Sequence, residues 1–132
     1  MTEKKPFYLL VVFWGEKHRR LFLDLALSSL LADRNIPALN NGMRQNRLLI
    51  ATSEEDWNAL KNDPIFQKAE QVIQPEFIPL HYQNDDSNKM LKMSAGHKAL
   101  TDRAFRDGAW GVHLCPDVIY SNGSLTTVRA KA

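Results

Sequence analysis

The sequence has only one cysteine, Cys115, among 132 residues. A single cysteine excludes an internal disulfide and a cluster of metal-binding thiolates, and it fits a reducing compartment. No apolar run approaches the ~20 residues that a membrane-spanning helix needs. The run at residues 7–14 is followed directly by charged residues, without the small-residue cleavage site of a signal peptide. We therefore expect a cytoplasmic protein without a membrane span.

Two familiar nucleotide-binding motifs are also missing. The chain contains no Gly-x-Gly-x-x-Gly, which disfavours an ordinary dinucleotide site, and it contains no Walker-type phosphate loop. Its 17 basic and 15 acidic residues leave a net charge of +2. Such a balance provides no large attraction to nucleic acid, so nucleic acid is not an expected partner.

The composition suits one globular domain over residues 1–132. The chain is 44% hydrophobic and 24% charged, which is ordinary for a folded protein. Its length is enough to bury one hydrophobic core but too short for two separate domains.

Four apolar runs predict strands. Residues 7–13 form a continuous run without alternation, which is typical of a strand covered on both faces. Residues 47–52 and 109–114 predict two further buried strands. Two prolines interrupt the run at residues 71–80, and proline confines such a strand to a sheet edge or a bulge.

Helices are expected between these strands. A polar stripe indicates a helix at residues 17–31 that packs on the sheet. A second helix follows a cap at Thr52 or Ser53 and ends near Asn62, and a third covers residues 88–107 before Gly108. Residues 33–46 are predicted as an irregular connection, either a functional loop or, as the favoured alternative, a mobile surface excursion. A short turn is expected at residues 65–69, and residues 126–132 show no recognisable element.

The resulting β-α-β-α-β-α-β order predicts the fold class. We expect an α/β protein, a three-layer α/β/α sandwich with a mostly parallel, Rossmann-like sheet of about four strands and right-handed crossovers. Ligands of such sheets bind outside the carboxyl ends of the strands.

Asp117 follows the last predicted strand and is the best-placed acid. At a strand end it can hold a divalent metal or a polar ligand. The pair Asp85 and Asp86 lies in a polar loop and is interpreted as a helix cap rather than a metal site. Cys115 has no basic partner in the sequence and is interpreted as a small buried hydrophobe, not a nucleophile.

Four further residues are candidates for substrate binding. Trp14 and Gly15 follow the first strand, where they form either a pocket wall or an aromatic plug and a tight turn. His97 lies on an apolar helical stripe, which favours a core histidine over a ligand for phosphate or a base. Lys92, like Lys89, either neutralises a phosphate or belongs to a solvated face.

The segment from residue 89 to 125 resembles glycosyltransferases of the A-type, nucleotide-diphospho-sugar transferase fold, in their amino-terminal half. The resemblance rests on a helix with Met-Ser-Ala-Gly-His-Lys-Ala-Leu, then a strand, then Pro-Asp-Val-Ile-Tyr-Ser-Asn-Gly-Ser-Leu. The earlier Val-Val-Phe-Trp-Gly is similar to the family's first nucleotide-binding unit.

This resemblance implies a nucleotide-sugar donor as partner, with residues near Trp14 lining the base pocket. Asp117 matches the acid that holds Mn²⁺ or Mg²⁺ on the donor diphosphate. The chain has Asp-Val-Ile where the family has Asp-x-Asp, and it ends soon after the motif. It is therefore expected to be a donor-binding part of a larger enzyme, without an evident general base.

Two alternatives stay open. One is a noncatalytic α/β module that binds a partner protein through an exposed edge or helix face, and a homo-oligomer belongs with this expectation. The other is a small hydrolase that uses His97 or His113, although the sequence pairs neither histidine with a nucleophile.

Overall fold

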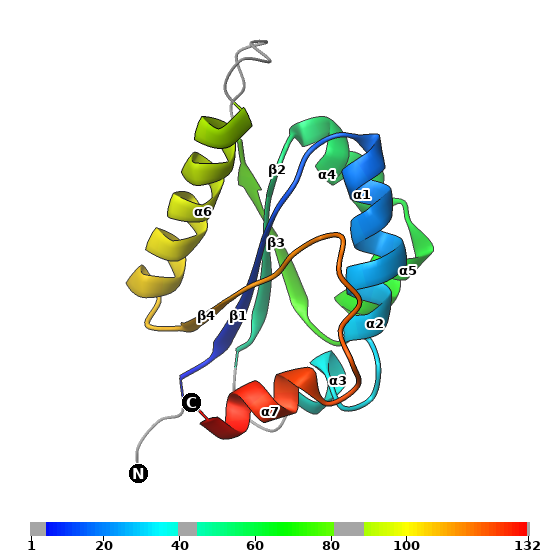
Figure 1. Ribbon diagram of the computed structural model, residues 1–132, viewed down its shortest axis with the longest axis vertical. Coiled ribbons are helices and arrows are strands. Elements are labelled where there is room, and N and C mark those ends of the chain that lie inside the picture. Colours follow the sequence, from blue (N-terminus) through cyan, green and yellow to red (C-terminus); the bar gives the residue numbers. More distant parts are fainter. Residues whose placement is uncertain (1–4, 40–44, 81–88, 132) are drawn as a thin grey trace.

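The protein is an α/β fold built on a four-stranded parallel sheet. The computed structural model describes residues 5–39, 45–80 and 89–131. The sheet order is β3-β2-β1-β4 and every neighbouring pair is parallel, which confirms the predicted fold class (Figure 1). The strands are β1 (Phe7–Val12), β2 (Arg47–Thr52), β3 (Gln74–Pro79) and β4 (Trp110–His113).

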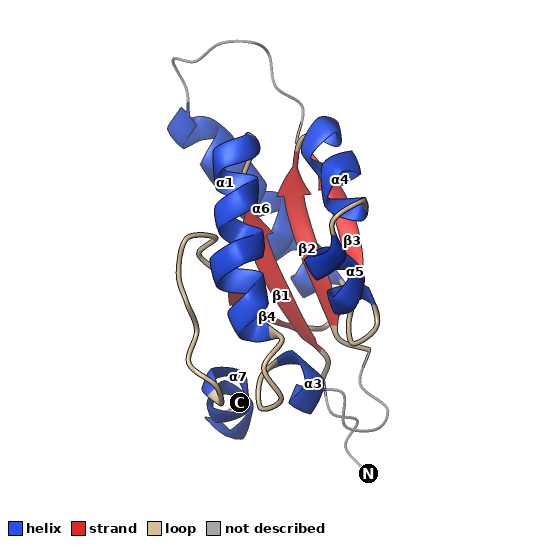
Figure 2. Cartoon of the chain, turned by 90° about the vertical axis from the view of Figure 1, so that its right-hand side faces the viewer, coloured by secondary structure: helices blue, strands red, loops and turns tan. Residues whose placement is uncertain are grey.

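Helices cover both faces of the sheet (Figures 1 and 2). On one face, α1 (Glu16–Leu21), the π-helical η1 (Phe22–Leu27) and α2 (Ser28–Leu30) follow one another without a break in helical backbone. The same face carries α4 (Glu54–Lys61) and α5 (Pro64–Glu70), whereas α6 (Lys89–Arg106) covers the opposite face. Two short helices, α3 (Ile36–Leu39) and α7 (Ser124–Lys131), lie below the sheet in Figure 1.

The central strand β1 supplies both halves of the core. All six of its residues are buried, as the continuous apolar run predicts. Leu9 and Val11 pack with Phe22 on the α1 side, whereas Leu10 and Val12 belong to the cluster on the α6 side. Alternate side chains of a strand point to opposite faces, so one run of sequence builds two layers of contact.

Strand β4 differs from the prediction of a buried strand. Trp110, Gly111 and His113 are exposed. Within the part of the chain that the structure describes, β4 pairs only with β1 and is therefore an edge strand. The proline-interrupted β3 forms the other edge, which confirms its prediction.

The predictions for three connecting segments were wrong. The described part of residues 33–46 is not a surface excursion, because Asn35, Ile36 and Leu39 are buried and α3 forms there. Residues 65–69 belong to helix α5, which the Asp63 carboxylate caps by accepting from the Ile65 amide at 2.8 Å. The unrecognised terminus is α7, whose weak amphipathic pattern conceals it in the sequence.

Among the described residues, no helix combines the length and the apolar character that crossing a bilayer requires.

Helix α6 approaches the sheet most closely at Gly96. A Cβ atom at this position would lie 2.8 Å from Val12 Cγ1, and Val12 is held in the buried strand. We expect Gly96→Ala to lower the free energy of unfolding by about 1 kcal/mol, because overpacking of about 1–3 kcal/mol exceeds the gain of about 1 kcal/mol in helix propensity. Urea denaturation measures the change.

The matched control is Ser94→Ala, at an exposed position of the same helix. This substitution is expected to change the free energy of unfolding by less than about 0.5 kcal/mol. A Gly96→Ala protein as stable as the Ser94→Ala protein would show that α6 can move away from β1 at little cost.

Candidate functional site at the carboxyl edge of the sheet

The strand order creates a crevice beside β1. The β1–α1–β2 crossover lies on one face of the sheet and the β3–α6–β4 crossover lies on the other, so the strand order reverses between β1 and β4. Such a switch point is where open α/β sheets bind ligands. A cavity of ≈ 300 Å³ lies there, lined by Val12, Phe13, Trp14, His18, Met90, Met93 and Pro116.

The cavity is mainly apolar. Trp14 enters it from the turn after β1, Met93 from α6 and Pro116 from the loop after β4. Its volume is at the lower end of the range for small-molecule pockets, about 300–1,000 Å³. An indole, a thioether and a proline ring suit a flat aromatic or apolar ligand group better than a charged one.

Asp56 holds the rim of this crevice, a role that the sequence did not indicate. Its buried carboxylate accepts from the Gly15 amide at 2.8 Å, from Arg19 Nη1 at 2.6 Å and from Ser53 Oγ at 2.6 Å. The contact with Gly15 joins the turn after β1 to the turn after β2.

Gly15 has a conformational reason to be glycine. Its φ is 90°, which side chains rarely adopt, and a Cβ atom there would meet nothing within 4 Å. Because its amide donates to Asp56, this geometry supports the tight-turn interpretation of Gly15 more directly than a contact with a ligand.

The loop after β4 folds back over the α1 side of the sheet. The Cys115 amide donates to Tyr120 Oη at 2.9 Å and closes a turn around Pro116 and Asp117. The Tyr120 amide then donates to Ser29 Oγ at 2.9 Å. Burial raises the pKa of Tyr120, although the hydrogen bond from the Cys115 amide partly opposes the rise, so its hydroxyl stays protonated at neutral pH. Cys115 itself is exposed, contrary to the prediction, because this turn carries it away from the core.

Buried Asn35 anchors the end of the same loop. Its side-chain oxygen accepts from the amides of Gly123 and Leu125, each at 3.1 Å. Its Nδ2 group donates to the carbonyls of Ser29 and Ser121 at 3.2 and 3.1 Å. One amide side chain therefore fastens the loop and α7 to the end of α2.

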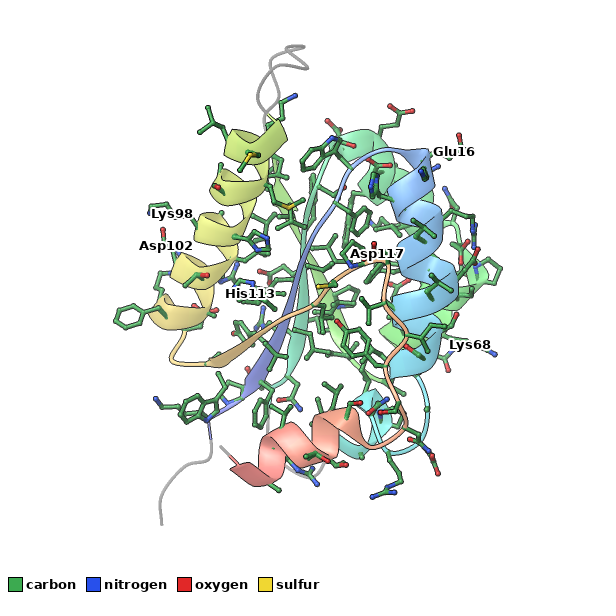
Figure 3. The ribbon with its side chains drawn as sticks, in the orientation of Figure 1. Glu16, Lys68, Lys98, Asp102, His113 and Asp117 are labelled. Carbon is green, nitrogen blue, oxygen red and sulfur yellow. The ribbon has the colours of Figure 1, made fainter. Side chains whose placement is uncertain are left out.

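Asp117 is exposed beside Pro116, in the loop on the α1 side of the sheet (Figure 3). No group of three or more His, Cys, Asp or Glu side chains placed to hold a metal occurs among the described residues. Lys92 is half-buried on α6 and does not line the cavity. Asp85, Asp86 and the side chain of Lys89 lie outside the described residues.

His97 lies with His113 rather than in the apolar core. Their Nδ1 atoms are 3.3 Å apart, and His113 Nε2 is 3.2 Å from Thr101 Oγ1. Partial burial lowers the pKa of His113, and the neighbouring His97 lowers it further. His97 does not line the cavity, which begins one helical turn away at Met93. Trp14 is thus the one predicted site residue within the cavity lining.

A larger depression of ≈ 780 Å³ lies elsewhere, at the amino ends of β2 and β3. Polar side chains dominate its lining, including Gln45, Lys61 and Gln74. We place the candidate site at the carboxyl edge instead, because the strand order reverses there and open α/β sheets bind ligands at that point.

Asp56→Ala tests whether the rim depends on the buried carboxylate. The substitution leaves the Gly15 amide and Arg19 without their acceptor, so we expect the free energy of unfolding to fall by about 2–4 kcal/mol. Chemical denaturation measures it. Asp24→Ala is the control, because Asp24 forms an exposed ion pair with Arg20 and its loss should change stability little. Equal effects of the two substitutions would contradict the assigned role.

The lowered pKa of His113 predicts a pH dependence. The unfolded chain, with a histidine pKa of 6.5, binds this proton more readily than the folded chain. The contribution to stability is therefore present above pH 6.5 and is lost as the pH falls through the unfolded and then the folded pKa. His113→Gln should reduce the loss of stability between about pH 7.5 and about pH 5, measured by urea denaturation with a chelator present. An unchanged pH dependence would contradict this prediction.

Comparisons of the chain with protein-family models, with curated proteins and with solved structures give no match. The resemblance of residues 89–125 to glycosyltransferases accordingly stays a hypothesis that rests on the residues themselves. Any function for this protein has to be argued from the geometry of the carboxyl edge.

Proposed function

We propose that the protein binds the nucleotide part of a nucleotide-diphospho-sugar donor at the carboxyl ends of β1 and β4. The observation that carries this proposal is the ≈ 300 Å³ cavity with Trp14 in its wall, at the switch point of the sheet. A nucleobase is flat and aromatic, so it suits an apolar cavity with an indole on one side.

The residues around the cavity suggest how the donor would be oriented, with its base inside the cavity and its diphosphate outside. Pro116 lines the cavity and Asp117 follows it, exposed to solvent. With the base against Trp14, the diphosphate would leave the apolar interior toward the loop that carries Pro116 and Asp117. The fit is supported by chemistry: the base is buried and the charged phosphates stay hydrated.

Asp117 gives no resident metal site by itself, because no group of three or more metal-binding side chains forms around it among the described residues. Mg²⁺ or Mn²⁺ arriving with a diphosphate fits better, since such ions often use one or two carboxylates together with substrate phosphates and water. Asp117 would hold that ion. When bound, the ion would neutralise charge on the diphosphate leaving group.

The proposed reaction class is glycosyl transfer, in which an acceptor hydroxyl attacks the sugar and the nucleoside diphosphate leaves. The chain's own contribution would be to orient the donor: Trp14 holds the base, and the Asp56 network keeps the β1–α1 turn in place. No side chain of the described residues has a position that assigns it as the general base, so the proposal concerns donor binding first.

Trp14→Ala tests the base pocket. We expect it to weaken binding of the preferred nucleotide sugar by about 5- to 150-fold, because stacking of a base on an aromatic ring contributes about 1–3 kcal/mol. Isothermal titration with UDP-, GDP- and CMP-sugars, each with and without Mn²⁺, measures it. Asp117→Asn should remove the Mn²⁺-dependent part of the affinity and leave the metal-free part unchanged.

Trp110→Ala is the matched control, because Trp110 is an exposed tryptophan of β4 outside the cavity lining. It should leave donor affinity unchanged. Absence of binding to all three donor classes at millimolar concentration would overturn the proposal.

A noncatalytic interaction module is the second candidate. The observation in its favour is the exposed edge of β4, where Trp110 is 45% exposed and nearby Phe105 is 87% exposed. An open strand edge with apolar neighbours is a surface that another chain can pair with. Concentration-dependent association in light scattering, together with no donor binding, would favour this candidate over the first.

A further inference from the structure

The contact between α6 and β4 brings two imidazoles together in the geometry of a metal pair. His97 Nδ1 and His113 Nδ1 are 3.3 Å apart and the ring centroids are 5.1 Å apart. Two histidines bound to one tetrahedral Zn²⁺, with Zn–N of about 2.0–2.1 Å, have nitrogens about 3.3 Å apart and ring centroids about 5.2 Å apart. Both separations match.

We propose that His97 and His113 bind one divalent transition-metal ion of the Zn²⁺ type through their Nδ1 atoms. Imidazole nitrogen prefers Zn²⁺, Ni²⁺ and Cu²⁺ to the oxygen-seeking Mg²⁺ and Ca²⁺. The site is separate from the ion proposed at Asp117, which would be held by oxygen atoms. It also does not depend on whether the protein binds a nucleotide sugar.

Thr101 is placed to fix the correct tautomer of His113. Its Oγ1 lies 3.2 Å from His113 Nε2 and can accept the proton of that nitrogen. With the proton on Nε2, the lone pair of Nδ1 faces His97 and is available to a metal. Metal-binding histidines usually donate their other N–H to such an oxygen atom, which sets the ring orientation.

The backbone holds the two rings in place. Helix α6 runs close beside β4, because a Cβ atom at Gly111 would lie 3.6 Å from Ala104 Cβ, an ordinary contact distance. Leu100 and Ala104 of α6 are buried against the sheet. The pair is therefore carried by a packed helix and a paired strand, which is the arrangement that preorganises a site.

The surroundings of the two histidines leave room for a metal ion to reach them from solvent. Lys98 and Asp102 form an ion pair with each other at 2.6 Å, on the side of α6 that points away from His113 (Figure 3). His113 is exposed and His97 is half-buried, so an ion can enter from solvent. Because no third His, Cys, Asp or Glu of the described chain joins the pair, water fills the remaining coordination positions.

Isothermal titration of the untagged chain with Zn²⁺ tests the proposal. We expect saturable binding of one ion per chain, no comparable binding of Mg²⁺, and loss of Zn²⁺ binding in both His97→Gln and His113→Gln. Thr101→Val should weaken Zn²⁺ binding by about tenfold through the second ring nitrogen. His18→Gln, which removes a histidine elsewhere, should retain it.

Two further readouts separate the site from a merely structural contact. In the side-chain ¹H–¹⁵N spectrum, Zn²⁺ should shift the Nδ1 resonances of both His97 and His113. Zn²⁺ should also raise the melting temperature of the wild-type chain but not of the two histidine variants, whose folding is checked by circular dichroism. Zn²⁺ binding that survives both histidine substitutions, or coordination through Nε2, would overturn the proposal.

Discussion

Burial of β1 is the constraint on which the rest of the structure depends. This strand is paired on both edges and covered on both faces, so its side chains define where every other layer must lie. Its neighbours β2 and β4 are reached through helices on opposite faces. The crevice at its carboxyl end lies where the strand order reverses, and Trp14, which follows β1, lines it.

Two buried polar side chains hold the turns and loops at the carboxyl edge of the sheet in place. Asp56 joins the turns after β1 and β2, and Asn35 fastens the loop after β4 to the end of α2. Asn35 satisfies two buried backbone amides, which would be costly to leave without an acceptor in an apolar interior. The edge keeps its shape because these bonds connect turns that are distant in sequence.

The carboxyl edge of the sheet has an apolar cavity and a separate pair of histidines. The cavity at Trp14 is apolar and suits a base, whereas His97 and His113 lie together on the other side of β4 and suit a soft cation. Asp117 belongs to neither cluster, since the turn closed by Tyr120 leaves it in solvent. The proposed binding of a ligand group at Trp14 and the proposed binding of a metal at the histidines therefore rest on different contacts and can be tested separately.

The local sequence pattern predicted the positions of the strands, the two longest helices and the parallel character of the sheet. An unbroken apolar run such as residues 7–13 is typical of a strand that is covered on both faces. The local pattern left Trp14 open between a pocket wall and an aromatic plug, and Trp14 lies in the cavity lining. The pattern did not predict α7 or the burial of Asn35. Each depends on the other, because Asn35 accepts hydrogen bonds from backbone amides at the start of α7. The pairs that shape the edge, Gly15 with Asp56 and His97 with His113, are separated by 41 and 16 residues and leave no periodic trace. Only the tertiary structure decided them, because hydrogen bonds between distant turns depend on how the layers pack.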